Sequence, residues 1–164
     1  MSSSVDRVLT AAAAAGLDVE IVEFPDGTRT ADDAAAAVGC KVDQIVKSMI
    51  FAAGDERKIV LALTSGANRV DGDRLADLAG VDACHRATAD EVRSATGFAI
   101  GGVAPIGHLS PLPTWIDPHL LTFDTIWAAA GSPRHVFAVS AQRLVELTGA
   151  TIADFTVSAE APPS

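Results

Sequence analysis

The stretch IVKSMIFA (residues 45–52), followed by the turn GDER (54–57) and the run KIVLAL (58–63), decides the fold. Both apolar runs have the length of a strand and are rich in residues that favour extended backbone. The polar turn between them is short, and a connection this short joins neighbouring antiparallel strands. We therefore predict a β-hairpin here, and a mixed sheet rather than a doubly wound parallel one.

Capping signals on both sides of the hairpin predict five helices. Each begins near a serine, threonine or aspartate that can cap the first turn, and each ends at a glycine that can adopt the left-handed conformation. They run from Ser3 or Ser4 to Gly16, from Thr30 to Gly39, from Asp71 or Asp73 to Gly80, from Thr88 to Gly97 and from Ser140 to Gly149. Further short strands are predicted over residues 19–24, 115–116, 125–130, 135–139 and 151–155.

These elements predict the fold class and its limits. We expect a single compact α/β domain over residues 1–157, in which helices surround a mixed, largely antiparallel or barrel-like sheet. The tail over residues 158–164 is expected to be frayed.

The composition limits the classes of function. With 164 residues, 49% of them hydrophobic, the chain can bury a core without disulfides or metals. Cys40 and Cys84 form no C-x-x-C pair, the histidines do not cluster, and no run approaches the ~20 apolar residues of a membrane span. We expect a cytoplasmic protein that uses no metal, cofactor or membrane. The net charge of −9 argues against a broad basic surface, so we expect no DNA partner and only a small contact with RNA.

Lys47 is the first candidate functional residue. In a strand, residues two apart share a face, so Lys47 lies on the same apolar face as Met49 and Phe51. A lysine is almost never fully buried without a partner. Lys47 must therefore reach past the edge of the sheet to solvent, pair with a carboxylate, or face a cleft that receives an anion. The spacing alone leaves these three possibilities open.

The second candidate is the loop GFAIGGVAPIG (residues 97–107). Its four glycines and one proline are typical of an ordered loop whose backbone approaches a ligand closely, and equally of a plain crossover rich in turns. It fits neither the dinucleotide-binding G-x-G-x-x-G motif nor the P-loop. The chain also lacks a G-x-S-x-G elbow, and Ser65 has no histidine near it in sequence, which argues against a serine nucleophile.

In combination, QIVKS (residues 44–48), GF (97–98), GGVAPIG (101–107) and AGS (130–132) resemble the YbaK/EbsC family. That family is similar to the editing domain inserted in bacterial prolyl-tRNA synthetases, and the order and spacing of the motifs match over nearly the whole chain. The resemblance implies a mixed α/β editing fold and a free-standing aminoacyl-tRNA deacylase, which removes a wrong amino acid from the 3′ end of a tRNA. It further implies tRNA for proline carrying a small or sulfur-bearing amino acid, and a prolyl-tRNA synthetase as a second partner.

The resemblance also implies roles for particular residues. Lys47 matches the family's functional lysine and would hold the substrate by its charge, while the backbone of Gly101 and Gly102 would offer N–H groups to a developing oxyanion. Pro105 ends the G-x-x-x-P loop that Gly101 begins. Further contacts with the substrate are expected in and after the turn beside the pocket, at Gly131, Ser132 and His135. Some members carry an acidic residue on the strand over 135–137, and its absence here leaves the amino acid undetermined.

Two other functions stay open on the sequence. One is a non-catalytic module that binds a nucleotide or a synthetase with the same pocket, and the other is an esterase or thioesterase acting on a free small molecule. The lack of a triad does not exclude deacylation, because an aminoacyl ester is already activated. We interpret Asp117 as a turn cap, and Trp115 and Trp127 as core residues. For RNA, Lys47 is the first candidate for a phosphate contact and Arg134 the second.

Overall fold

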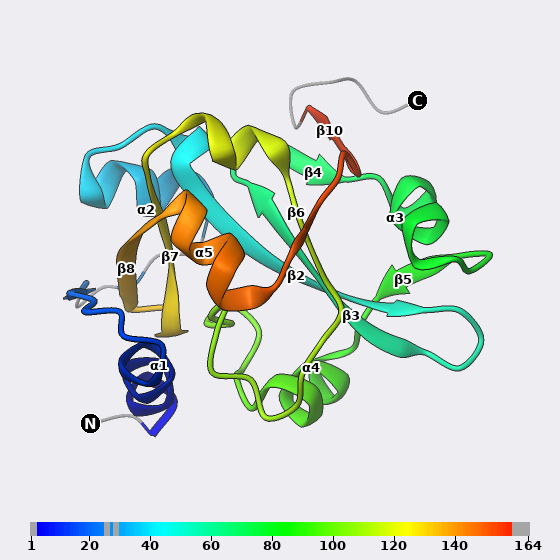
Figure 1. The fold of residues 1–164 in the computed structure, drawn as a ribbon, viewed down its shortest axis with the longest axis horizontal. Helices are drawn as coiled ribbons and strands as arrows, with labels where there is room; N and C mark the ends of the chain where they lie inside the picture. Colours follow the sequence, from blue (N-terminus) through cyan, green and yellow to red (C-terminus); the bar gives the residue numbers. More distant parts are fainter. Residues whose placement is uncertain (1–2, 25–26, 28–29, 159–164) are drawn as a thin grey trace.

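β2 (Ile45–Ala53) and β3 (Lys58–Ser65) form the predicted hairpin in the computed structural model of the chain, which describes residues 3–24, 27 and 30–158. The two strands are antiparallel and pair without a break from Val46 opposite Ser65 to Ala53 opposite Lys58. Figure 1 shows them crossing the middle of the molecule. Both strands bury most of their aliphatic side chains, which is why this stretch forms the centre of the sheet.

The other strands extend the sheet on both sides, and they confirm that it is mixed and largely antiparallel. The order is β1-β8-β7-β2-β3-β6-β9, and β5 pairs with the far end of β2. The pairs β2–β7, β3–β6 and β6–β9 are parallel and the other pairs are antiparallel. The bounds are β1 (Ile21–Glu23), β5 (Cys84–Arg86), β6 (Thr114–Ile116), β7 (Thr125–Ser132), β8 (His135–Ser140) and β9 (Thr151–Ile152). The strands β4 (Asn68–Val70) and β10 (Thr156–Ser158) form a separate small sheet.

All five predicted helices are present, with their predicted caps at most ends. They are α1 (Ser3–Ala14), α2 (Ala31–Val38), α3 (Gly72–Ala79), α4 (Ala89–Thr96) and α5 (Ala141–Thr148). The T-x-x-E box before α4 forms in full, because Thr88 Oγ1 accepts from Glu91 N at 3.1 Å and Glu91 Oε1 accepts from Thr88 N at 2.9 Å. Two short 3-10 helices, η1 (Val42–Gln44) and η2 (Pro118–Thr122), complete the fold.

The structure differs from the prediction in its shortest strands. β4 and β5 were not predicted, because three residues that include arginine or histidine show no apolar alternation. They are strands because β10 and β2 pair with them. The single strand expected over 151–155 is divided into β9 and the separate β10. Ser158 ends β10, and the rest of the predicted tail lies outside the described residues.

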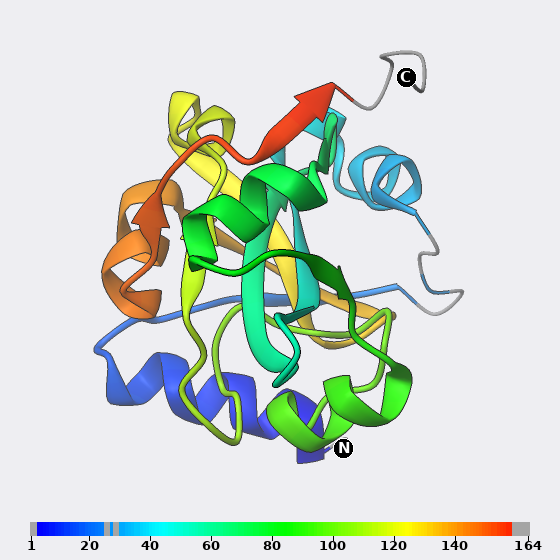
Figure 2. The same cartoon turned by 90° about the vertical axis from the view of Figure 1, so that its right-hand side faces the viewer.

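Helices cover the sheet on both faces and thereby fix which side chains of β2 meet which core. Val46 and Ile50 belong to the main core, with residues of α1, α4 and α5. Phe51 belongs to a second core that includes Leu75 of α3. Figure 2 shows α3 lying in front of β2 and β3. Because side chains alternate along a strand, Lys47 leaves β2 on the same face as Phe51. Within the part of the chain described, no helix is long and apolar enough to cross a membrane.

Candidate functional site

A cleft opens where the sheet divides beside β2. β7 pairs with β2 only at Ile45 and Val46, and β5 pairs with it only from Phe51 to Ala53. Among the described residues, no strand therefore lies against this edge of β2 over residues 47–50. A cleft of about 530 Å³ lies here, and it reaches side chains on both faces of the sheet. Most of its lining comes from β2, β5, β7, α2 and the loop after α4, and it includes Lys47, Ser48, Arg86, Gly101, Val103 and Trp127.

Lys47 lines this cleft and is half-buried. Its ammonium group donates a hydrogen bond to the carbonyl oxygen of Asn68. Burial lowers the pKa of Lys47, and the negative charge of Asp117 opposes that effect while the charge of Arg86 adds to it. Within the described part of the chain, Lys47 forms no ion pair with a carboxylate. Of the three possibilities left by the sequence, the geometry matches a lysine that faces a cleft and whose charge is only partly compensated.

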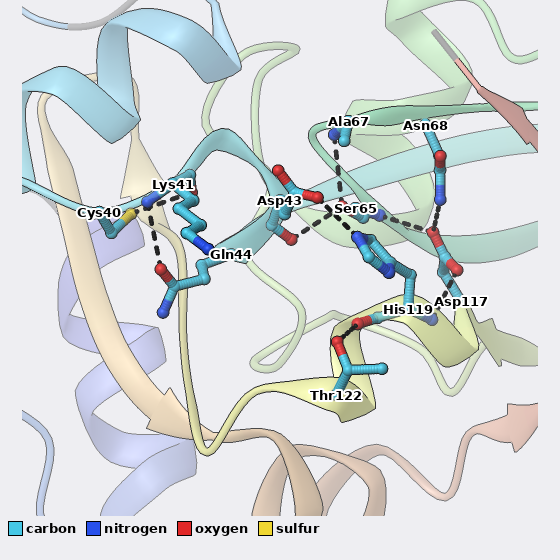
Figure 3. A network of polar contacts seen from close by, with 10 residues as sticks. All are labelled: Cys40, Lys41, Asp43, Gln44, Ser65, Ala67, Asn68, Asp117, His119 and Thr122. Carbon is cyan, nitrogen blue, oxygen red and sulfur yellow. Dashed lines mark hydrogen bonds and ion pairs between the residues drawn. The ribbon is translucent and has the colours of Figure 1, made fainter.

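Asp117 organises the backbone around Lys47. It is 1% exposed, and its Oδ2 accepts from Ser65 N at 3.1 Å and from Asn68 Nδ2 at 2.9 Å. Its Oδ1 accepts from His119 N at 2.9 Å, which confirms the predicted cap. Figure 3 shows this carboxylate between the end of β3 and η2. Asp117 thus holds Asn68, whose carbonyl oxygen in turn holds Lys47, although the sequence predicted only the cap.

A second recess of about 850 Å³ adjoins the cleft, since Asp32 and Gly66 line both. The recess is acidic, and its lining includes Asp43, Asp117, Asp154 and His119. His119 Nε2 lies 2.7 Å from Asp43 Oδ2, and this hydrogen bond lowers the pKa of Asp43. No group of three side chains in the described ranges could hold a metal ion. The recess repels phosphate, whereas Lys47 and Arg86 make the cleft the more favourable place for an anion.

The predicted glycine loop reaches the cleft through Gly101. Gly101 is exposed, has a φ of 93° and lines the cleft. Gly102 is buried instead, and its N–H donates to the carbonyl oxygen of Ala99 at 3.0 Å. A Cβ on Gly102 would lie 2.7 Å from Ser132 Cα. The packing therefore explains the glycine at 102, and only Gly101 of the two keeps an N–H that no described residue accepts. Pro105, in the same loop, is buried and does not line the cleft.

The turn between β7 and β8 supports that loop from behind and does not line the cleft. Ser132 Oγ and His135 Nδ1 lie 2.6 Å apart, and His135 Nε2 lies 3.0 Å from Glu23 Oε2. Ser132 Oγ also accepts from Arg134 N at 3.0 Å. Gly131 is buried, and a Cβ on it would lie 2.7 Å from Ser4 O of α1. Gly131, Ser132 and His135 are thus close to the site, but the contacts seen here stabilise the turn.

Two residues of the cleft had no signal of function in the sequence. Arg86 belongs to β5, which was not predicted, and only the pairing with β2 brings it to the cleft. Trp127 was expected in the core, yet it is only partly buried and lines the cleft beside Ile45. Arg134, the predicted second phosphate contact, is exposed on the β7–β8 turn and does not line the cleft.

The chain is similar in sequence to bacterial proteins of two kinds. It is 27% identical to YwhH of Bacillus subtilis over 129 residues, and this alignment covers 79% of this chain and 81% of YwhH. It is 32% identical over 97 residues to the proline–tRNA ligase of Limosilactobacillus fermentum, which is 57% of this chain but only 17% of the ligase.

Two solved structures share the fold over nearly their whole length. One, described as a candidate trans-editing enzyme for prolyl-tRNA synthetase, superposes with a TM-score of 0.89 at 45% identity and covers 96% of this chain and 99% of that one. The protein APE2540 superposes with a TM-score of 0.84 at 28% identity, covering 92% and 99%. Residues 25–147 match the family model of the aminoacyl-tRNA editing domain. The chain therefore belongs to the aminoacyl-tRNA editing domain family.

Proposed function

We propose that this chain is a trans-editing deacylase, which hydrolyses the ester of a mischarged tRNA for proline that carries a small or sulfur-bearing amino acid. The observation that carries this proposal is the meeting of Lys47 and Gly101 in one cleft of about 530 Å³. Pockets of ~300–1,000 Å³ hold small ligands, so the cleft has room for the aminoacylated end of a tRNA but not for its body.

The chemistry needs no protein nucleophile. A water molecule adds to the ester carbonyl carbon, and the negative charge that develops on the carbonyl oxygen is stabilised by the free N–H of Gly101. The tetrahedral intermediate then expels the ribose oxygen, which takes up a proton, and the free amino acid leaves. Lys47 holds the anionic end of the tRNA against the cleft. This placement matters more than a strong nucleophile, because the ester is already activated.

The experiment that tests the proposal is a panel of mischarged tRNAs incubated with the purified chain. Catalytic turnover of at least one of them supports the deacylase. Stoichiometric binding without turnover would identify a binding module instead. Hydrolysis of free aminoacyl esters as fast as that of the same amino acid on tRNA would identify a small-molecule esterase.

The pH dependence of turnover should report the charge of Lys47. Since burial lowers its pKa from 10.5, the enzymatic rate, corrected for spontaneous hydrolysis, should fall at a pH below that ordinary value as Lys47 loses its proton. Asp117→Asn removes the negative charge that raises this pKa, so the fall should move to lower pH. Asp154→Asn is the matched control, because Asp154 lines only the recess. An unchanged alkaline limb in Asp117→Asn, with folding confirmed by circular dichroism, would contradict the role of Lys47 as a charged clamp.

The salt dependence of tRNA binding should be shallow. With a net charge of −9, most of the surface repels RNA, and the cations of the cleft are Lys47 and Arg86. Each neutralised phosphate of a single strand contributes a slope of ~−0.7, so log K against log salt should fall no more steeply than about −2. Arg86→Gln should flatten the slope. A slope of about −5 would require a basic groove elsewhere, although Arg57 and Arg74 are already paired with Glu91 and Asp154.

A further inference from the structure

Ser48 carries a buried hydroxyl group without a partner. Its Oγ is the one buried side-chain nitrogen or oxygen in the described residues that makes no hydrogen bond. A buried polar group left unpaired destabilises a fold, and such groups are rare in native structures. An alanine would fill the same place without that cost. The fold alone therefore gives no reason for the hydroxyl, and a bound ligand could supply its partner.

The position of Ser48 points to the cleft. Ser48 lines it, and leaves β2 on the face opposite to Lys47. Val46 and Ile50 leave β2 on the same face as Ser48. They belong to the main core and also line the cleft, and the same is true of Val103 of the glycine loop. The charged side chain and the hydroxyl thus serve different sides of the gap. One side suits an anion, and the other suits a small, mostly apolar group.

The backbone of Ser48 also faces the gap. Ile50 O accepts from Ala87 N at 3.1 Å, on the side of β2 away from β3. In an antiparallel ladder the N–H and C=O of one residue point to the same side, and those of residues two apart point alike. The unbroken register with β3 carries this rule back to Ser48. Its N–H and C=O therefore point into the gap, where a ligand can pair with them.

We infer that Ser48 selects an amino acid whose side chain carries a hydroxyl, so that seryl-tRNA is preferred to alanyl-tRNA; this rests on the proposed function. The amino group of the bound residue donates to the carbonyl oxygen of Ser48. A turn about the Cα–Cβ bond of Ser48 brings its Oγ to the hydroxyl of the substrate, and staggered rotamers of serine interconvert easily. Alanine in the same place leaves Oγ unpaired. Sites built to hydrogen-bond a substrate hydroxyl discriminate in this way against the analogue that lacks it.

The test compares the same tRNA charged with serine or with alanine. The wild-type chain should favour the seryl form by ~10-fold or more in kcat/KM, and Ser48→Ala should remove most of that preference by slowing the seryl form alone. Its Tm should stay the same or rise. Ser140→Ala is the matched control: Ser140 caps α5, where its Oγ accepts from Arg143 N, so its loss should lower Tm and leave the preference unchanged.

Binding of amide-linked seryl- and alanyl-adenosine, which cannot be hydrolysed, separates this inference from the proposed function. If the wild-type chain binds seryl-adenosine more tightly and Ser48→Ala abolishes this preference, the inference is supported even where no tRNA is turned over. In that case only the proposed deacylase activity is refuted. Turnover of both tRNAs with no preference, or an equal fall for both in Ser48→Ala, overturns the inference and leaves the deacylase standing.

Discussion

Lys47→Met is expected to lower kcat/KM for deacylation by ~10² or more, which corresponds to about 2.7 kcal/mol of lost transition-state stabilisation. Methionine keeps an apolar stem of nearly the same length as that of lysine, and it removes the ammonium group with its charge and its hydrogen bond to the carbonyl oxygen of Asn68. Lys47 has no ion-pair partner among the described residues, and burial already lowers its pKa. Its charge is therefore not what holds the fold together. The Tm of the variant should stay close to that of the wild type.

Lys58→Met is the matched control for this change. Lys58 is the exposed first residue of β3, at the far end of the same hairpin, and does not line the cleft. Its loss alters the net charge equally, so it corrects for any general effect of charge on tRNA binding. Near-normal turnover by a folded Lys47→Met would exclude the clamp. Unfolding of that variant, with Lys58→Met intact, would make Lys47 a structural residue.

Local signals were sufficient for most of the fold. From α2 onward, each α-helix begins at a side chain that caps it within three residues and ends at a left-handed glycine, so the signal lies inside the element itself. The β2–β3 hairpin is likewise local, since one short turn joins its strands. β5 could not be found in this way. Its three residues are strand only because β2, more than thirty positions earlier, pairs with them.

The sequence points to a site residue where that residue breaks a local pattern. It does not reveal a residue whose hydrogen-bond partners lie far away in the chain. Lys47 is conspicuous because a cation interrupts an apolar strand face, and the structure places it in the same cleft as Gly101. Their roles in catalysis remain predictions. Asp117 reads as a turn cap, because nothing in the sequence shows that Ser65 and Asn68 will reach its carboxylate from about fifty residues away. Gly102 shows the reverse case, since its contact with the backbone of Ser132 gives a packing reason for a glycine that motif comparison assigns to catalysis.

Three glycines of the loop over 97–107 allow catalysis and packing to be separated. Gly97 ends α4 with a φ of 79°, and a Cβ there would lie 2.5 Å from Arg7 Nη2. Arg7 ties the loop to α1, because it donates to the carbonyl oxygens of Thr96 and Gly107. Gly102 packs against Ser132. Gly101 has open space instead, since the nearest atom to its Cβ would be Pro133 Cγ at 3.7 Å.

Gly101→Val should therefore lower deacylation per folded molecule by ~10² or more. Its φ of 93° makes a branched residue costly, as at Gly97, so its Tm should fall too, but its Cβ displaces no neighbouring atom. Its side chain would stand in the cleft where the ester must approach the backbone N–H. Gly97→Val should lose more stability and less activity than Gly101→Val. At both positions the left-handed conformation costs a branched residue about 1–2 kcal/mol, which for a chain of this size corresponds to a fall in Tm of roughly 2–8 °C. Gly97→Val also displaces Arg7, so its Tm should fall further, while its folded fraction stays active. Gly102→Ala should resemble Gly97→Val, since its Cβ meets backbone. Measuring Tm and kcat/KM on all three variants decides the matter: an equal loss of activity per folded molecule at positions 97 and 101 would mean that Gly101, too, is needed only for the shape of the loop.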